Sequence, residues 1–123
     1  KIKRKTLINK LDNIFSKYIR LKHSNNDHCK CFTCQKEFHW TKIQAGHFIS
    51  RKHYATRWDE DNVRPQCLSC NVYRYGEQYI FGKNLGIKLS EEMLNNSRKI
   101  VKFTNDEILN KIDYYSDNVS KMI

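Results

Sequence analysis

Four of the five cysteines in the chain form two Cys-X-X-Cys pairs, an arrangement typical of metal-binding knuckles. The first pair is Cys31 and Cys34, and the second is Cys67 and Cys70. Each pair can place two sulfur atoms on one ion, and together they supply the four thiolates of a structural tetrahedral zinc site. The segment between the pairs, 35–66, is longer than in common zinc fingers. The spacing therefore predicts a structural Zn²⁺ with an additional unit between its two knuckles.

The remaining cysteine, Cys29, makes the total odd, and an odd number does not favour a disulfide framework. A redox dithiol, or small core residues, would be the alternative interpretation of the pairs, but two such pairs in so short a chain favour a metal site. His28 and His39 are possible substitute ligands. For both histidines an exposed polar role is the simpler interpretation, and for Cys29 it is a free thiol.

Hydrophobic spacing predicts the elements that must position these cysteines. Apolar side chains recur at helical intervals over residues 7–19, so we expect an amphipathic helix within a basic N-terminal segment, 1–28. Residues 38–50 are rich in β-favouring types and are interrupted at Gly46. This pattern predicts two short strands that turn near the glycine.

The part of the chain after the second cysteine pair is predicted to be helical. A helix is expected over about 68–85, ended by Gly86, and a short helix is expected to start at Ser90. Thr104 and Glu107 have the spacing of a capping box in front of a last amphipathic helix. We therefore expect a single domain, 1–123, made of an N-terminal basic helix (1–28), a cysteine-bearing core (29–85) and a C-terminal helical segment (86–123).

The charge of the chain favours a polyanionic partner. It has 123 residues, with 23 Lys and Arg against 13 Asp and Glu, and a formal net charge of +10. A basic balance attracts nucleic acid, but an acidic protein or a membrane surface would also respond to it. No apolar run has the length of a membrane span. With the cysteines of a reduced compartment, we expect a cytoplasmic protein without a membrane partner.

Four motifs follow one another in the middle of the chain: CFTC (31–34), QAGHFISR (44–51), DEDNVRPQCLSCN (59–71) and YRYGEQY (73–79). In this order they resemble the HNH, or ββα-metal, nuclease motif, in which a zinc knuckle clamps a strand–strand–helix unit. The closer resemblance is to the phage NinG (Rap) family of recombination endonucleases. The resemblance implies an α+β fold, in which a small zinc-stabilised ββα-metal (HNH-like) core of residues 29–85 is flanked by N- and C-terminal helices.

The resemblance also implies catalytic roles that suit the chemistry of the residues. Phosphodiester hydrolysis needs a base that activates water and a cation that neutralises charge. His47 suits the role of base, because an imidazole of ordinary pKa is largely neutral at cellular pH. Asn71 offers a hard carbonyl oxygen to Mg²⁺ or Mn²⁺, and Asn62 would hold the loop and orient the histidine. Taken singly, the three have ordinary structural explanations: a packed or surface histidine, a turn residue and a helix cap.

Two neighbouring positions qualify this assignment. Many HNH enzymes place an aspartate directly before the general base as a second metal ligand, and Gly46 occupies that position here. Asn71 would then be the one expected protein ligand of the catalytic ion. Arg51 is a candidate phosphate clamp, since it closely follows His47. The other basic residues of this segment have the simpler interpretation of a solvated face; they are Lys52, His53, Arg57 and Arg64.

The resemblance implies a metal-dependent DNA endonuclease that cuts branched recombination intermediates of a phage, such as junctions and displacement loops. The expected partner is DNA, the place is the bacterial host cytoplasm, and a homodimer is possible. The alternative is a zinc-bound DNA-binding module without catalysis. His47, Asn62 and Asn71 together favour the enzyme, whereas Gly46 favours the module. A restriction or homing-type HNH enzyme is a weaker third option, because no separate base-reading domain is evident.

Overall fold

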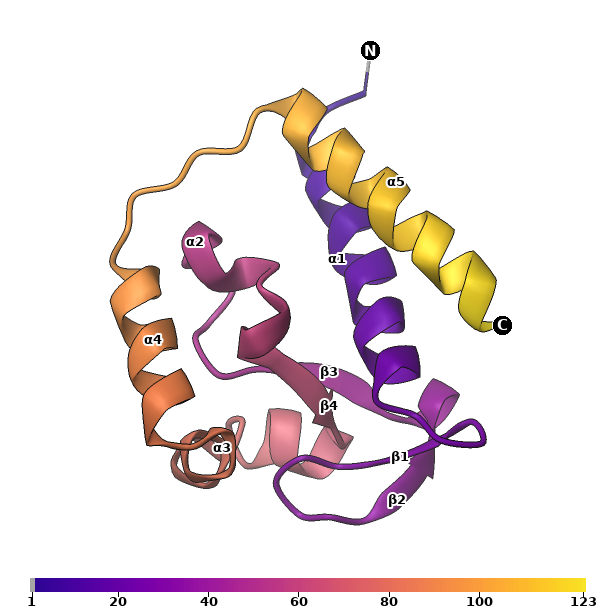
Figure 1. Cartoon of the computed structure of the whole chain (residues 1–123), viewed down its shortest axis with the longest axis vertical. Helices are drawn as coiled ribbons and strands as arrows, with labels where there is room; N and C mark the ends of the chain where they lie inside the picture. The colour runs from indigo at the N-terminus through magenta and orange to yellow at the C-terminus, as the bar shows by residue number, and fades with distance from the viewer. Residues whose placement is uncertain (1) are drawn as a thin grey trace.

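The computed structural model describes residues 2–123 and combines helices with two small antiparallel sheets (Figure 1). Two long helices, α1 (Arg4–Lys22) and α5 (Asn105–Met122), lie side by side along one flank. The strands are β1 (His28–Lys30), β2 (Glu37–His39), β3 (Gln44–His47) and β4 (Val63–Gln66). The shorter helices are α2 (Tyr54–Arg57), α3 (Gln78–Leu85) and α4 (Ile87–Ser97).

Helices α1 and α5 form the main hydrophobic core. The apolar positions of the predicted N-terminal pattern are buried in α1, which extends beyond residues 7–19 to Arg4 and Lys22. They pack against the apolar stripe of α5 and against Trp58 and Val63 from the middle of the chain. Both helices start at the same end of the molecule, where the Arg4 guanidinium donates a hydrogen bond of 3.0 Å to Asn105 Oδ1. The predicted amphipathic helices at both ends are therefore confirmed.

The predicted hairpin over residues 38–50 is wrong. Strand β2 pairs with β1, so that Phe38 lies opposite Cys29, whereas β3 pairs with β4. A short 3-10 turn, Trp40–Lys42, separates β2 from β3 and directs them into different sheets. Gly46 lies inside β3 rather than at a turn. A side chain at this position would overlap the amide of Gln66 on β4, so the strand needs a glycine here.

The helix predicted over 68–85 is interrupted. A π-helical turn, Ser69–Tyr73, is followed by a tight turn at 74–77, and α3 begins only at Gln78. Tyr75, Gly76 and Glu77 have left-handed backbone angles, with φ of 54°, 86° and 49°, which break a right-handed helix. Gly86 ends α3 with φ of 94°, as predicted.

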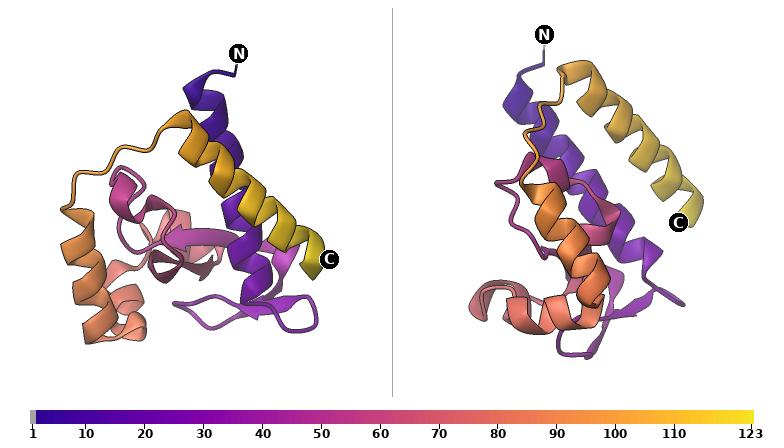
Figure 2. Two further views of the ribbon diagram at one scale, coloured as in Figure 1. Left: turned by 45° about the horizontal axis from the view of Figure 1, so that its top comes forward. Right: turned by 60° about the vertical axis from the view of Figure 1, so that its left-hand side comes forward.

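Helix α4 begins at Ile87, earlier than the predicted start at Ser90, because the backbone N–H of Ser90 already bonds to the Gly86 carbonyl. It packs against α2 and α3 (Figure 2). The buried ring of Phe81 on α3 lies against Phe32 and Phe48, with ring centroids 5.0 and 5.9 Å apart. These contacts attach α3 to the turn between β1 and β2 and to the segment directly after β3. Within residues 2–123, no helix has the length and apolar character needed to cross a membrane.

The capping box at the start of α5 is present, and it generates a stability prediction. The Thr104 hydroxyl accepts from the Glu107 amide at 3.1 Å, and the Glu107 carboxylate accepts from the Thr104 amide at 2.8 Å. We expect Thr104→Ala to lower the free energy of unfolding by about 1 kcal/mol, measured by urea denaturation. Ser120→Ala, in the last turns of the same helix, is the control and should change it by less than about 0.5 kcal/mol. Equal effects of the two changes would contradict the prediction.

Candidate metal centre and adjoining cleft

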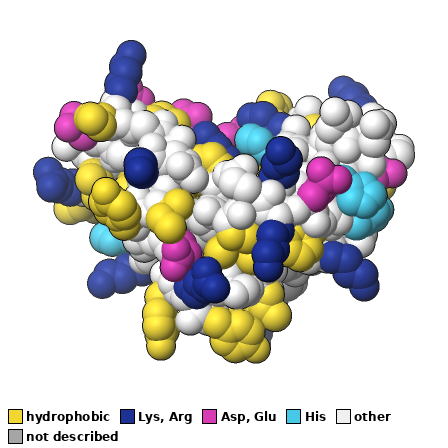
Figure 3. Space-filling view, turned by 90° about the horizontal axis from the view of Figure 1, so that it is seen from below, with side chains coloured by type: hydrophobic (Ala, Val, Ile, Leu, Met, Phe, Trp, Pro, Cys, Tyr) yellow, Lys and Arg dark blue, Asp and Glu magenta, His cyan; other side chains and the backbone are white. Residues whose placement is uncertain are grey.

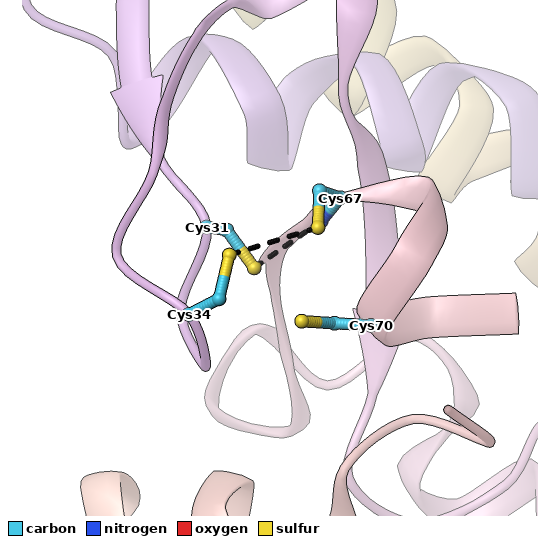
Figure 4. A group of neighbouring side chains, drawn as sticks. All are labelled: Cys31, Cys34, Cys67 and Cys70. Carbon is cyan, nitrogen blue, oxygen red and sulfur yellow. Dashed lines mark hydrogen bonds between the residues drawn. The ribbon is translucent and has the colours of Figure 1, made fainter. Parts of the chain in front are cut away.

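The two Cys-X-X-Cys pairs meet in space, as the spacing predicted. Cys31 and Cys34 lie in the turn after β1, Cys67 directly follows β4, and Cys70 lies on the π-helical turn. Their four sulfur atoms point toward one another (Figure 4) and lie within 4.8 Å of one another. The sulfur atoms of Cys34 and Cys67 are 3.8 Å apart. Four thiolates around Zn²⁺ at the usual bond length form a tetrahedron with edges of about 3.8 Å, so the cluster can hold a metal such as zinc.

The electrostatics of the cluster also fit a divalent cation. The sulfur of Cys31 accepts a hydrogen bond of 3.3 Å from the backbone N–H of Cys67 and lies 3.5 Å from the Thr33 hydroxyl. Burial opposes ionisation of Cys31, but these hydrogen bonds lower its pKa to about 6. For Cys70, burial and the neighbouring cysteines raise the pKa to about 12. Four thiolates so close together therefore need a positive charge between them, which a metal such as Zn²⁺ would supply.

The substitute ligands considered from the sequence lie outside the cluster. His28 and His39 face each other across the β1–β2 pair, with ring centroids 5.3 Å apart. The Nδ1 of His28 lies 3.0 Å from the Asn26 carbonyl, and that of His39 lies 2.8 Å from the Thr41 hydroxyl. Cys29 is buried within β1. In the part of the chain that the structure describes, the metal cluster consists of the four paired cysteines.

A cleft of about 810 Å³ lies beside the cysteine cluster, between α1, β3 and the segment that contains the π-helical turn. Three of the predicted site residues, His47, Arg51 and Asn71, line it. Asn71 directly follows the cluster residue Cys70, and its backbone N–H bonds to the Cys67 carbonyl at 2.8 Å. A metal in the cluster would therefore hold one wall of the cleft in place.

The ring of His47 is held in one orientation and kept neutral. Its Nε2 lies 2.9 Å from the Arg57 carbonyl oxygen, and because a carbonyl can only accept, Nε2 carries the proton and Nδ1 keeps its lone pair. Burial, aided by the positive charge of Arg51, lowers the pKa of His47 to about 4. The imidazole is therefore unprotonated at Nδ1 at neutral pH, which is the form a general base requires.

The carbonyl that orients His47 is itself positioned by helix α1. Asp12 on α1 accepts two hydrogen bonds from the Arg57 guanidinium, at 3.1 and 2.6 Å, and a third of 2.9 Å from the Trp58 indole. This bidentate pair is well shielded, since both side chains are 14% exposed. The N-terminal helix thus contributes to the site as well as to the core.

Asn62 is a structural residue of the loop between β3 and β4. It is fully buried, its Oδ1 accepts from the Ile49 amide at 2.7 Å, and its Nδ2 donates to the carbonyls of Ile49 and Thr56 at 3.0 Å each. These bonds hold the loop, as expected from the sequence. The bond that orients His47 comes instead from Arg57, so Asn62 acts on the histidine only through the loop.

Asn71 lines the same cleft as His47. Its Nδ2 donates to Gln44 Oε1 at 2.8 Å, and Gln44 also lines the cleft. Because the amide nitrogen is occupied in this way, the side-chain Oδ1 is the atom left to bind a cation. Oxygen ligands of this kind suit Mg²⁺ or Mn²⁺, and the role of Asn71 as an ion ligand stays a prediction.

The absence of an aspartate before His47 has a steric reason. A Cβ on Gly46 would overlap Gln66 Oε1 and lie 2.9 Å from the Gln66 Cβ. Gln66 is fully buried, and its Nε2 donates to Thr33 Oγ1 at 3.1 Å and to the Gly76 carbonyl at 2.7 Å. It therefore connects the cysteine cluster to the turn at 74–77, and glycine at position 46 makes room for it.

The arginines of this region have different roles. Arg57 is bound to Asp12, and Arg64 donates to the carbonyls of Glu60 and Val63 and lies over the Phe32 ring. Arg51 is 59% exposed at the cleft and has only a loose ion pair of 3.6 Å with Asp12. Arg51 is therefore the arginine among them that is free to meet a phosphate.

Sequence reasoning missed Asp12, Gln44 and Gln66, which all contact the predicted site residues or their supports. One signal for Asp12 was present, since it is the one acidic residue in α1, a helix with several lysines and arginines. The two glutamines had no comparable signal. Their importance comes from neighbours that are distant in the sequence.

The cluster geometry generates a prediction about the metal. We expect native protein to contain one zinc per chain, and Cys67→Ala combined with Cys70→Ala to lose the zinc and the fold. Structural zinc of this type contributes about 10–16 kcal/mol. Cys29→Ala is the matched control and should retain the zinc. Metal analysis by mass spectrometry and circular dichroism would test both variants; full zinc content in the double variant, or no zinc in wild type purified without chelator, would contradict the prediction.

Comparison with known proteins identifies the family. A family model described as Bacteriophage Lambda NinG protein matches residues 1–122. No curated protein and no solved structure matches the chain. The match includes both cysteine pairs, all the cleft residues and the two long helices. Since it extends over nearly the whole sequence, the chain belongs to the NinG family of phage lambda.

Proposed function

We propose that the protein is a metal-dependent DNA endonuclease of the HNH type. The observation that carries the proposal is the arrangement of His47, Asn71 and Arg51 around one cleft, with His47 neutral and its Nε2 bound to the Arg57 carbonyl. The order β3, β4, π-helical turn and α3 supports a ββα-metal core, with the cysteine cluster beside it. Membership of the NinG family supports a role in phage recombination.

Each of the three cleft residues has a different role in the proposed hydrolysis. The Nδ1 of His47 takes a proton from a water molecule while the water oxygen forms a bond to phosphorus and the bond to the leaving oxygen breaks. Asn71 Oδ1 would hold Mg²⁺ or Mn²⁺, and the bound ion supplies neutralisation of the charge on the phosphate and the leaving oxygen. Arg51 binds a phosphate oxygen. After reaction, the imidazolium returns its proton to solvent.

The substrate we propose is branched DNA, such as junctions and displacement loops. The net charge of +10 supports a polyanionic partner, and the family supports recombination as the setting. Host cytoplasm as the location and a homodimer as the assembly belong to the same proposal.

A zinc-bound DNA-binding module without catalysis is the second candidate, and one observation favours it. Asp12 provides the one carboxylate that lines the cleft within residues 2–123, and both of its oxygens are bound to Arg57. With Gly46 before the histidine, Asn71 is left as the principal ligand for a catalytic ion. A binding module would retain DNA affinity and lack cleavage in any divalent metal.

The endonuclease proposal predicts distinct effects for the two main site residues. His47→Ala should lower the cleavage rate by about 10²- to 10⁴-fold while DNA binding and folding remain, because the base acts in the transition state. Asn71→Ala should also lose cleavage, with partial recovery in excess Mn²⁺, because it removes an ion ligand.

These rates can be measured with labelled duplex, single-stranded and four-way-junction DNA in Mg²⁺ or Mn²⁺. His39→Ala, which changes a histidine outside the cleft, is the control and should cleave like wild type. A His47→Ala rate within about threefold of wild type would refute the general-base role, because the loss expected for a general base is far larger.

The low pKa of His47 predicts the pH dependence of cleavage. The neutral imidazole is the active form, so the rate should stay nearly constant from pH 7.5 down to pH 5.5 and fall only as the pH approaches about 4. If the base had the ordinary histidine pKa, the cleavage rate would fall about tenfold between pH 7.5 and pH 5.5. Initial rates at fixed metal concentration, with zinc content checked at each pH, would distinguish the two. A tenfold fall with retained zinc would show that His47 is not the buried neutral base.

A further inference from the structure

The turn between the π-helical turn and α3 presents an aromatic ring at the rim of the cleft. We propose that Tyr75 is a stacking site for one unpaired nucleobase, so that the protein favours DNA with a single-stranded segment beside the cleft. The inference rests on the proposed function only in taking the cleft as the place where DNA binds. It adds a binding site and a substrate feature, an unpaired base, to that function.

The position of Tyr75 connects it to the site. It lines the same cleft as His47 and Asn71, yet the residue is 89% exposed, so the ring contributes almost nothing to the hydrophobic core. An exposed ring at the edge of the cleft can receive a base without first breaking contacts within the protein.

The backbone at Tyr75 is costly for a tyrosine. Its φ of 54° lies in the left-handed region, which favours glycine or asparagine and is uncommon for a bulky side chain. The turn is held from its buried side: Gly76 donates its N–H to the Cys70 carbonyl at 2.8 Å and accepts from Gln66 Nε2 at 2.7 Å. The cysteine cluster and Gln66 therefore impose this conformation. The turn thus fixes the position of Tyr75, and its ring, which makes little contact with its own chain, is held at the rim of the cleft where a partner can reach it.

The chemistry of the surroundings identifies that partner as single-stranded DNA. Bases stack on aromatic rings whatever their identity, provided that they are not already stacked within a duplex. Arg51 lines the same cleft as Tyr75, so a phosphate next to an unpaired base on the ring would meet positive charge. Figure 3 views the molecule from the side on which α3 and the β1–β2 pair lie in Figure 1. Side chains of the hydrophobic class project there among lysine and arginine side chains.

Tyr79 provides a matched control within the same segment. It is 82% exposed and lies in the first turn of α3, but it does not line the cleft. The two tyrosines therefore share residue type and exposure and differ in their relation to the cleft and in backbone conformation. A general effect of exposed tyrosines on DNA binding would appear at both positions.

The test measures binding by fluorescence anisotropy, with zinc-containing protein and without added Mg²⁺ or Mn²⁺, so that cleavage does not interfere. Three labelled probes are compared: a duplex, the same duplex with unpaired thymines in one strand, and the same bulge with abasic sites in place of the thymines. Wild type should bind the thymine bulge more tightly than the other two. Tyr75→Asn should reduce affinity for the thymine bulge by about 5- to 150-fold, the loss expected for one base–aromatic stack.

The other variants test whether the preference for the thymine bulge depends on an aromatic ring at position 75. Tyr75→Trp and Tyr79→Asn should keep the preference for the thymine bulge. Tyr75→Asn should melt at the same temperature as wild type or higher, because asparagine tolerates the left-handed backbone. The inference is overturned if wild type does not distinguish thymines from abasic sites, or if Tyr75→Asn keeps the preference for the thymine bulge. It is also overturned if Tyr79→Asn loses this preference to the same extent as Tyr75→Asn. Loss of the preference in Tyr75→Asn together with a lower melting temperature would overturn it as well. Absence of binding of wild type to all three probes would instead refute the proposed DNA-directed function.

Discussion

The convergence of the two Cys-X-X-Cys pairs is the constraint on which the rest of the core depends. It joins the turn after β1 to the end of β4 and the start of the π-helical turn, segments that are separated by more than thirty residues. Thr33 extends the constraint, because its hydroxyl lies between the Cys31 sulfur and the Gln66 amide. Gln66 then binds the Gly76 carbonyl. A metal at the cluster would thus be coupled, through one buried glutamine, to the turn at the rim of the cleft.

A second interaction joins the N-terminal helix to the same cleft. Asp12 binds Arg57 through both oxygens, and the Arg57 carbonyl receives the Nε2 proton of His47. The ion pair is largely withdrawn from solvent, so removing one partner would leave an uncompensated charge in a poorly solvated place. Helix α1 therefore has two functions, since its apolar face packs against α5 and its single acidic residue organises the loop after β3.

The cysteine cluster and the Asp12–Arg57 ion pair hold opposite walls of the cleft. A small chain can position polar groups there because both walls are fixed. The loop that carries Arg51 is held by the three hydrogen bonds of buried Asn62 and by the Arg57 guanidinium, which donates to the Arg51 carbonyl at 2.8 Å. The opposite wall is held by the cysteine cluster and by the Asn71–Gln44 hydrogen bond. Gly46 lies between them, and its lack of a side chain lets β3 and β4 approach with Gln66 packed in the space. The same glycine that removes an expected ligand therefore makes this packing possible.

The features that depend on local chemistry could be predicted from the order of the amino acids alone. The cysteine spacing indicated the metal cluster, the capping box at Thr104 and the apolar stripes indicated the terminal helices, and the motif order indicated the cleft residues His47, Arg51 and Asn71. Strand pairing was decided only by the tertiary structure, because a short turn between β2 and β3 gives no sign of which strand each will join. The break before α3 and the roles of Asp12 and Gln66 were likewise tertiary. They arise from hydrogen bonds between residues far apart in the chain, and neither periodicity nor spacing records such contacts.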